Sequence, residues 1–430
     1  MNGIVNIMEN LSPDELDDFR QSVRAWLEAN CPASMRTPAS DEDDMVWGGS
    51  KVSFKTKDHQ LWFERMRDKG WFTPDWPTEY GGGGLSSAQA QILTREMARL
   101  HCRQPQINLG IWMLGPVLLE FGTQEQKQTH LPPMARGEVR WCQGFSEPNA
   151  GSDLASLQMK AVPDGDDFIV TGSKIWTSHA DKSDAIYTLV RTDPNAKKQE
   201  GISFLLIDMT SPGITTQPIE LISGKSHFCE VFFDQVRVPQ KNLVGELNGG
   251  WTVAKRLMQH ERHAMAHLGD EGLSPYSLAD MAKKYLGCRT DGATGADPAS
   301  TELADAVMRD RIAALDMDDM AYQLTLRRAG EEIAAGGDAT ATTSTFKYYS
   351  TELEKRKNEA LIAILGTRGL GWDEQQSGGE ANSSFTEEEL AVTRGWLASK
   401  VMSIGGGTTE IQLNVIAKRV LGLPSASDCA

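Results

Sequence analysis

The chain is poor in cysteine and in positive charge. Its 430 residues include only six cysteines, scattered without a CxxC pair or another metal-ligand spacing, so we expect free thiols in a reducing compartment and no metal site. Lys and Arg number 43 against 59 Asp and Glu, which gives a net charge of −16 and a pI near 5.0. That balance argues against nucleic acid and against an anionic membrane surface as partners.

We also expect no signal peptide and no membrane span. No stretch approaches the roughly 18 apolar residues of a membrane span, and the opening residues MNGIVNIMENLSPDEL lack a basic region followed by an apolar run. We therefore expect a cytoplasmic protein with no membrane partner. At 47.2 kDa, the chain is long enough to form two or three domains around sizeable cores.

Helical spacing dominates the first 140 residues. Ser12, Pro13 and Glu15 predict a capped helix start, and the apolar side chains that follow recur at helical spacing. Further helices are predicted around Leu61–Met66, Ser87–Leu100, Gly115–Phe121 and Gln124–Met134. The Trp-, Pro- and Gly-rich segment Trp71–Gly84 predicts a loop.

From Gly144 the pattern changes to short runs rich in Val, Ile, Phe and Thr, which predicts a compact β domain. The predicted strands are Phe168–Val170, Ala185–Val190, Ile202–Ile207, Ile214–Ile219 and Glu230–Val238. Helical periodicity then continues to the end, interrupted by two polar segments, Gly287–Ser300 and Trp372–Glu389, that we expect to be solvated loops. The sequence thus predicts an α+β fold: an N-terminal helical domain (1–140), a middle β domain (141–245) and a C-terminal helical bundle (246–430).

The segment Trp141–Ala180 is the richest in groups that could hold a flat polar ring. Ser146, Ser152 and Asp153 supply hydroxyls and backbone amides, and Pro163–Gly165 then marks a turn between two strand-like runs. From spacing alone, a β-hairpin with a glycine loop explains the same residues. The pattern therefore indicates a rigid turn region and leaves its ligand open.

Three segments carry a resemblance to the acyl-CoA dehydrogenase family. Trp141–Asp153 followed by Ile175–Ser178 looks like that family's flavin- and thioester-binding segment. The likeness continues through Glu200–Pro239 to GGGTTEIQLNVIAKRVLGL at Gly405–Leu423. It is nearest to the large subunits of pimeloyl-CoA dehydrogenases. The resemblance implies bound FAD and an acyl-CoA substrate, with helices on either side of the middle strands enclosing the acyl chain.

Glu261 is the candidate general base. It lies in the apolar stripe of a predicted amphipathic helix, Trp251–Leu268, where burial would raise the pKa of an unpaired carboxyl. From the pattern alone, an ion pair with another element is the simpler explanation. In many family members the base is a Glu just before the Gly-Thr near the C-terminus, but Gly406 stands there in this sequence. Glu261 with Arg262 matches the Glu-Arg pair that supplies the base in a minority of members.

The same resemblance implies the remaining site residues. The Gly406 N–H, with a hydroxyl of the flavin ribityl chain, would stabilise negative charge on the thioester oxygen. Thr409–Gln412 resembles a capping box that opens the final helix, although a glycine-rich hinge explains the composition equally well. Ser152 and Arg262 are predicted substrate contacts. The predicted cofactor contacts are Gln143, Phe145, Ser146, Trp176, Ser178, Gly366, Thr408 and Glu410.

Two departures from the family pattern concern the ADP half of the cofactor site. Only Gly366 and Gly369 remain of a glycine motif at Ala363–Gly369, and a basic-aromatic-glycine element is reduced to Lys283–Gly287. The resemblance implies electron-transfer flavoprotein as acceptor and a homodimer or homotetramer. The departures keep open a degenerate subunit of a heteromeric dehydrogenase. An acyl-CoA oxidase or flavin monooxygenase on the same fold is the other alternative.

Overall fold

The structure is a computed structural model that describes residues 11–37, 39, 44–269, 276–289, 302–335, 337, 340–372 and 384–424, with side chains 261–269, 333, 334 and 340 outside the described set. The chain divides into two compact units, Met1–Ile219 with Ser226–Glu261, and Glu220–Lys225 with Arg262–Ala430. The predicted three-domain boundaries divide the chain differently and stay a prediction. Among the described helices, none is long and apolar enough to cross a membrane.

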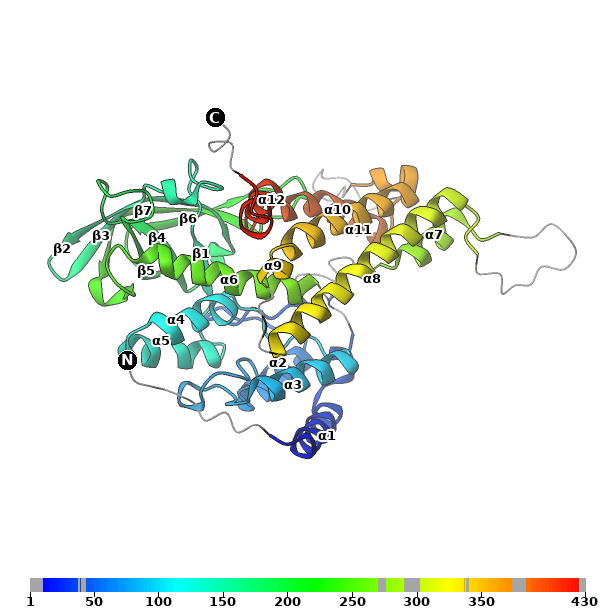
Figure 1. The fold of residues 1–430 in the computed structure, drawn as a ribbon, viewed down its shortest axis with the longest axis horizontal. Coiled ribbons are helices and arrows are strands. Elements are labelled where there is room, and N and C mark those ends of the chain that lie inside the picture. The colour runs from blue at the N-terminus through cyan, green and yellow to red at the C-terminus, as the bar shows by residue number, and fades with distance from the viewer. Residues whose placement is uncertain are drawn as a thin grey trace, which may run out of the picture. The chain divides into compact units, whose positions relative to one another are not determined.

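The first unit begins with helices, labelled in Figure 1. They are α1 (Pro13–Asn30), α2 (Lys57–Asp68), α3 (Ser87–Arg99), a π-helical turn (Gly110–Leu114), α4 (Gly115–Phe121) and α5 (Gln124–Ala135). At the starts of α1, α3 and α5, a Ser or Thr accepts from a backbone N–H of the first turn, and a Glu or Gln reaches back to the cap. The capping box confirms the predicted helix start at Ser12. The predicted helix Gly115–Phe121 is confirmed as α4. The predicted loop Trp71–Gly84 contains a short 3-10 turn, Thr78–Tyr80.

Among the described residues, eight strands form one sheet in the order β6-β7-β3-β2-β4-β5-β8, with β1 paired to β4 (Figure 1). The strands are β1 (Trp141–Gly144), β2 (Lys160–Asp164), β3 (Asp167–Ser178), β4 (Ala185–Arg191), β5 (Ile202–Asp208), β6 (Ile214–Ile219), β7 (Phe228–Pro239) and β8 (Leu243–Val244). All the predicted strands are present, and the predicted Pro163–Gly165 turn lies at the tip of the β2–β3 hairpin.

The central strands of this sheet are buried on both faces. Along β4, Tyr187 and Leu189 belong to a core that they share with the N-terminal helices, whereas Ile186 and Val190 belong to a core on the opposite face. This alternation follows from strand geometry, because successive side chains point to opposite faces. The first core also takes in Leu257, on the helix that follows the sheet. The N-terminal helices therefore cover one face of the sheet.

The remaining elements are helical. They are α6 (Gly250–Gly269), α7 (Leu278–Leu286), α8 (Ala306–Ala334), α9 (Thr340–Thr343), α10 (Phe346–Leu365), a 3-10 turn (Gly366–Leu370), α11 (Glu387–Met402), α12 (Thr409–Val415) and a π-helical turn (Ile416–Val420). From α7 onward they belong to the second unit, which has its own core where α10 packs against α7, α8 and α11.

Two sequence predictions in the second unit are wrong in detail. Of the predicted loop Trp372–Glu389, residues 373–383 lie outside the described residues. Its last three residues are helical, because Thr386 and Glu389 form the capping box that opens α11. The capping box expected at Thr409–Gln412 is also misplaced. Thr408 is the cap of α12, and its hydroxyl accepts from the Ile411 N–H. Of the predicted loop Gly287–Ser300, residues 290–300 lie outside the described residues.

Candidate functional site

The segment predicted to hold a flat ring crosses between β1 and the end of β3. Gln143, on β1, is half-buried, and its Oε1 accepts from the Tyr187 hydroxyl at 3.1 Å. After β1 the chain bonds directly to β3, where the Ile175 N–H donates to the Ser146 carbonyl at 2.9 Å. Because Trp176 follows Ile175, the structure places Ser146 beside the indole-bearing end of β3.

A buried ion pair fixes the loop that contains Ser146. Lys174, on β3, is fully buried, and its Nζ donates to the Phe145 carbonyl at 3.1 Å and to Glu147 Oε1 at 2.8 Å. The Glu147 carboxylate also accepts from the backbone N–H groups of Gln158 and Met159, at 2.7 and 2.9 Å. Burial lowers the pKa of Lys174 to about 8, an effect that Glu147 opposes. The pair thus anchors both ends of the loop.

Trp176 has a strained backbone. Its φ is +60°, and it lies at a β-bulge where the pairing of β3 with β7 shifts between Lys174 and Thr177. A side chain in this left-handed region costs roughly 1–2 kcal/mol. The indole is nevertheless 52% exposed and meets the Phe228 ring edge-on, with the centroids 6.1 Å apart. Strain combined with an exposed aromatic surface indicates a position that contacts a ligand.

The polar groups around Trp176 fit a flat heterocycle. Ser146 and Ser178 are half-buried, and neither hydroxyl has a hydrogen-bond partner among the described residues. Thr177 Oγ1 is buried and equally without a partner in that part of the chain. The Phe145 ring is 5% exposed and lies edge-on to Tyr187. Unpaired hydroxyls beside an exposed indole suit a ring whose edges carry hydrogen-bonding atoms.

Glu261 and Arg262 lie in α6, but their side chains are outside the described residues. The preceding turns of the helix bury Val253, Ala254 and Leu257. Glu261 follows Leu257 by four residues in the chain. The assignment of Glu261 as base stays a prediction.

The glycine loop before α12 offers a free backbone donor. Gly406 and Gly407 have φ of +66° and +92°, which glycine adopts without strain. The Gly406 carbonyl accepts from Gln412 Nε2 at 3.3 Å. Among the described residues, the Gly406 N–H has no acceptor, so it can donate to a ligand oxygen. Because α12 is only seven residues long, we assign no anion-binding role to its N-terminus.

The remaining predicted residues are spread over both units. Gly366 follows the last residue of α10 and has φ of +54°. The segment just before the glycine loop bonds to the first half of α10. Gly366 and Gly406 therefore lie towards opposite ends of that helix. Glu410 is exposed, and its own backbone N–H and the Thr408 hydroxyl lower the pKa of its carboxyl. Ser152 is exposed in the loop after β1.

The cations near the degenerate glycine motif are paired inside the second unit. Arg368 donates to both carboxylate oxygens of Glu389, at 2.7 and 2.6 Å, and lowers the pKa of Glu389 to about 2. The Tyr285 hydroxyl donates to the same carboxylate at 3.1 Å, and Lys284 pairs with Glu388. These contacts join the altered element Lys283–Gly287 to the start of α11. Lys284 and Tyr285 are therefore already engaged by carboxylates.

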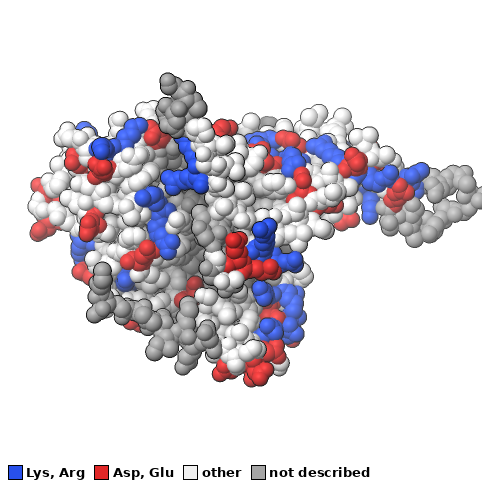
Figure 2. All heavy atoms as spheres, in the orientation of Figure 1, with Lys and Arg blue, Asp and Glu red and all other residues white. Residues whose placement is uncertain are grey.

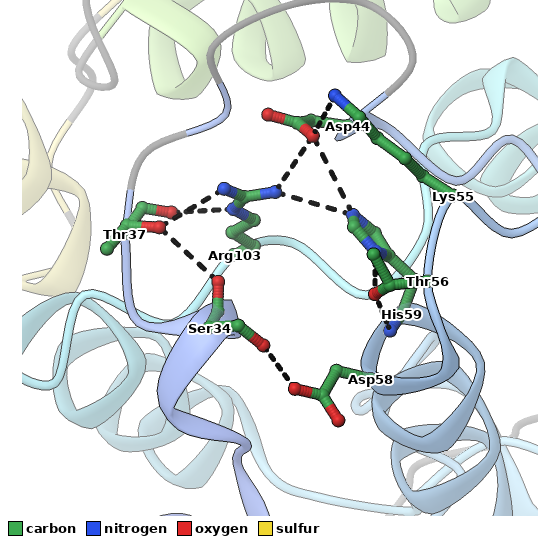
Figure 3. Close-up of polar contacts among 8 residues, drawn as sticks. All are labelled: Ser34, Thr37, Asp44, Lys55, Thr56, Asp58, His59 and Arg103. Carbon is green, nitrogen blue, oxygen red and sulfur yellow. Dashed lines mark hydrogen bonds and ion pairs between the residues drawn. The ribbon is translucent and has the colours of Figure 1, made fainter.

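Sequence reasoning missed a charged cluster in the N-terminal helical region (Figure 3). Asp44 and His59 are 7% and 4% exposed. Asp44 Oδ1 lies 2.9 Å from Lys55 Nζ, 3.4 Å from an Arg103 nitrogen and 4.0 Å from His59 Nε2. Arg103 also donates to the Thr37 carbonyl at 2.7 Å. The cluster ties together segments distant in sequence, so spacing offered no signal for it.

Surface features add no second candidate among the described residues. Acidic and basic side chains intermingle on the face shown in Figure 2. No group of three His, Cys, Asp or Glu side chains in the described ranges could hold a metal ion. A cavity of about 320 Å³ opens beside α2, between Val52, Arg67 and Arg136, and its lining contains none of the predicted site residues.

Comparison with known proteins matches the whole architecture. Domain profiles of acyl-CoA dehydrogenases match in order, with the N-terminal domain over residues 13–138, the middle domain over 142–236 and the C-terminal domain over 248–421. The acyl-CoA dehydrogenase IpdE1 of Mycobacterium tuberculosis is 31% identical over 95% of this chain and 98% of its own length. The chain belongs to the acyl-CoA dehydrogenase family.

Further relatives of this acyl-CoA dehydrogenase agree. FadE34 of Mycobacterium tuberculosis is 36% identical over 84% of this chain. The matched region covers 45% of the length of FadE34. The structure named Tcur3481-Tcur3483 steroid ACAD has a TM-score of 0.71 and 28% identity, over 97% of this chain and 99% of that one. The ChsE4-ChsE5 complex from Mycobacterium tuberculosis has a TM-score of 0.69 and 27% identity, over 97% and 100%.

These comparisons confirm the predicted fold class, an α+β acyl-CoA dehydrogenase fold with helical, β and helical parts. They also confirm an FAD-dependent oxidoreductase acting on a CH–CH group. The hydroxyls and exposed indole at the end of β3 fit the flavin ring of that cofactor. The nearer likeness to pimeloyl-CoA dehydrogenase large subunits stays a prediction.

Proposed function

We propose that this acyl-CoA dehydrogenase converts an acyl-CoA thioester to the 2-enoyl-CoA, with Glu261 as the general base. FAD, when bound, supplies the acceptor for the β-hydrogen, which leaves with its electron pair. The observation that supports the proposal is the strained, exposed Trp176 beside the unpaired hydroxyls of Ser146 and Ser178. Such groups are what a redox-active ring, rather than an ordinary core, requires at this position.

Different residues of the chain would remove the α-proton and stabilise the charge that develops on the substrate. Glu261 takes the α-proton, and the Gly406 N–H stabilises the negative charge that develops on the thioester oxygen. Both are needed because the α-hydrogen of a thioester is only weakly acidic. Ser152 and Arg262 contact the substrate. Around the flavin ring we assign Gln143, Phe145, Ser146, Trp176 and Ser178, and farther along the cofactor Gly366, Thr408 and Glu410.

The substrate we propose is a bulky acyl group, ring-bearing or dicarboxylic, with electron-transfer flavoprotein as acceptor. The likeness to pimeloyl-type enzymes supports this class, and so does a similar structure whose name includes a steroid. An anaerobic titration of the purified flavoprotein with a panel of acyl-CoA thioesters tests it, because a substrate bleaches the flavin. Rapid reoxidation of the reduced protein by air would indicate an oxidase or monooxygenase instead.

Glu261→Gln tests the assignment of the base. We expect a variant that holds FAD like the wild type but whose flavin is not bleached by the best acyl-CoA of the panel, because no side chain removes the α-proton. Glu246→Gln, an exposed site just before α6, serves as the matched control and should bleach normally. Normal bleaching of Glu261→Gln would refute the assignment.

A heteromeric assembly is the second candidate. Arg368 and Lys284 are engaged by Glu389 and Glu388, where the family resemblance implies a site for the ADP half of the cofactor across a subunit boundary. Two of the similar solved structures carry paired chain names, ChsE4-ChsE5 and Tcur3481-Tcur3483. Measuring FAD per chain for this protein alone, and after co-expression with a paralogous subunit, distinguishes the two. Full FAD content and turnover of the chain alone would exclude an obligate heteromer.

A further inference from the structure

The glycine loop that carries Gly406 is held at both ends by one ion pair on α10. Lys355 Nζ contacts the Glu352 carboxylate at 3.1 and 3.2 Å and the Ser403 hydroxyl at 3.3 Å. The same carboxylate accepts from the Thr409 hydroxyl at 2.9 Å. Ser403 and Thr409 flank the loop, and the Thr409 N–H donates to the Ser403 carbonyl at 3.0 Å. All of these residues belong to the second unit.

The loop needs such an anchor because its centre has little conformational preference. Gly405, Gly406 and Gly407 are consecutive glycines, and glycine loses more backbone freedom on ordering than any other residue. Gly405 is tied back by a bond from its N–H to the Val401 carbonyl, 3.0 Å long. The free N–H of Gly406 therefore takes its direction from the two ends of the loop and from the bond of the Gly406 carbonyl to Gln412 Nε2.

The anchoring pair is partly shielded from water. The side chains of Glu352 and Lys355 are 31% and 23% exposed, less than most surface pairs, and each makes one further hydrogen bond to the loop. Charge-assisted hydrogen bonds of this kind are stronger and more directional than those between neutral groups. A freely exposed ion pair, by contrast, contributes little rigidity.

We propose that Glu352 and Lys355 are positioning residues that set the direction of the Gly406 N–H toward the thioester oxygen. The inference rests on the proposed function, in which that N–H stabilises the developing oxyanion. Neither residue is assigned contact with the substrate or the flavin. Their loss would displace the donor without removing it, so the effect falls on the chemical step rather than on binding.

Lys355→Met and Glu352→Gln test the proposal, with the acyl-CoA that bleaches the wild-type flavin as substrate. We expect kcat to fall by roughly ten- to a hundredfold, less than the 10²–10³ lost when an oxyanion donor is removed outright, with KM and FAD content nearly unchanged. Lys355→Arg, which keeps a donor for both partners, should recover most of kcat.

The matched control is Lys400→Met. Lys400, on α11, pairs with Glu359, on α10, at 2.8 Å, so the variant removes an ion pair of α10 that has no side-chain bond to the loop. It should leave kcat unchanged. Equal kcat values for Lys355→Met and Lys400→Met would overturn the proposal, and so would a loss of kcat fully explained by lost FAD.

A second measurement separates removal of the α-proton from transfer of the β-hydride. A β-thia analogue of the same acyl-CoA has an acidified α-hydrogen but no β-hydrogen to transfer, so its deprotonation is seen as a long-wavelength flavin absorbance. We expect Lys355→Met to raise the apparent pKa of this bound analogue, and Lys400→Met to leave it unchanged. An unchanged pKa in Lys355→Met would overturn the proposal. If the wild type neither bleaches with any acyl-CoA nor deprotonates the analogue, the proposed function itself fails.

Discussion

At the scale of single residues, the middle sheet keeps a strained backbone conformation that glycine would adopt without cost. Trp176 has φ of +60° at a bulge, and Gln235, on the partner strand β7, has φ of +49° where the same two strands shift register again. Gln235 is exposed, and nothing in the structure associates it with the candidate site. The two positions therefore offer a comparison between strain alone and strain beside the predicted flavin contacts.

Trp176→Gly should separate stability from cofactor binding. Glycine relieves a backbone cost of roughly 1–2 kcal/mol, and half of the lost indole surface was exposed, so we expect the Tm of the apoprotein to stay level or rise. The same change removes the aromatic surface beside Ser146 and Ser178, so FAD affinity should fall by at least tenfold. Thermal unfolding and fluorescence titration with FAD measure the two effects.

Gln235→Gly is the control for this experiment, because it relieves similar strain away from the predicted ring site. It should match or exceed the wild-type Tm and bind FAD normally. Trp176→Phe, which keeps an aromatic ring, should bind FAD better than Trp176→Gly. If Trp176→Gly binds FAD as tightly as the wild type, the indole is not a cofactor contact.

At the scale of helices and strands, sequence signals worked where the interaction is local. The capping box of Ser12 and Glu15 was readable because both partners lie within four residues. The box of Thr386 and Glu389 has the same signature, but the acidic run around it favoured a solvated loop. Glu389 is instead helical and buried. Its carboxylate pairs with Arg368, which lies 21 residues earlier in the chain.

Non-local pairing explains the rest of what the sequence could not reveal. The strain at Trp176 depends on how β3 registers with β7, whose pairing residues lie more than fifty positions along the chain. The hydrogen bond that anchors the Gly406 loop joins Glu352 to Thr409, 57 residues apart. The family resemblance named Gly406 and Trp176 as site residues, but it contained no information about what holds them.

The charged cluster around Asp44 supports a prediction at this scale. Asp44 is the shared carboxylate for Lys55, Arg103 and His59. Removing one partner from a buried ionic cluster leaves the others uncompensated, which costs on the order of 3 kcal/mol. We therefore expect Asp44→Asn to lower the free energy of unfolding by about that amount, measured by urea denaturation.

Asp58→Asn provides the comparison for Asp44→Asn. Asp58 lies on α2 and accepts from the Ser34 hydroxyl (Figure 3), but it is partly exposed and lies outside the cluster. Its loss should change the free energy of unfolding by less than about 1 kcal/mol. Equal effects of the two variants would show that the cluster contributes no more than a surface hydrogen bond.

At the scale of the whole molecule, each unit contains a buried carboxylate held by arginine. In the first unit, Arg24 and Arg99 lower the pKa of Glu96 to about 2. In the second, Arg368 does the same for Glu389. A carboxyl whose pKa is lower in the folded chain stabilises the fold above its ordinary pKa of 4.5, and this contribution is lost as the pH falls towards about 2.

Acid should therefore destabilise both units in the same pH window, between 4.5 and about 2. Each carboxylate contributes on the order of 3 kcal/mol at neutral pH. Glu96→Gln and Glu389→Gln should each lower the Tm at neutral pH and make its decline below pH 4.5 shallower, because the proton uptake that drives that decline is gone. The double variant should show the shallowest decline of all.

Glu388→Gln distinguishes this linkage from a general effect of removing negative charge. Glu388 adjoins Glu389 in the chain, but its ion pair with Lys284 has side chains 27% and 55% exposed, and exposed pairs contribute little. This variant should keep the wild-type decline of Tm with acid. If Glu389→Gln also keeps it, the ion pair with Arg368 is not what couples the stability of the second unit to pH.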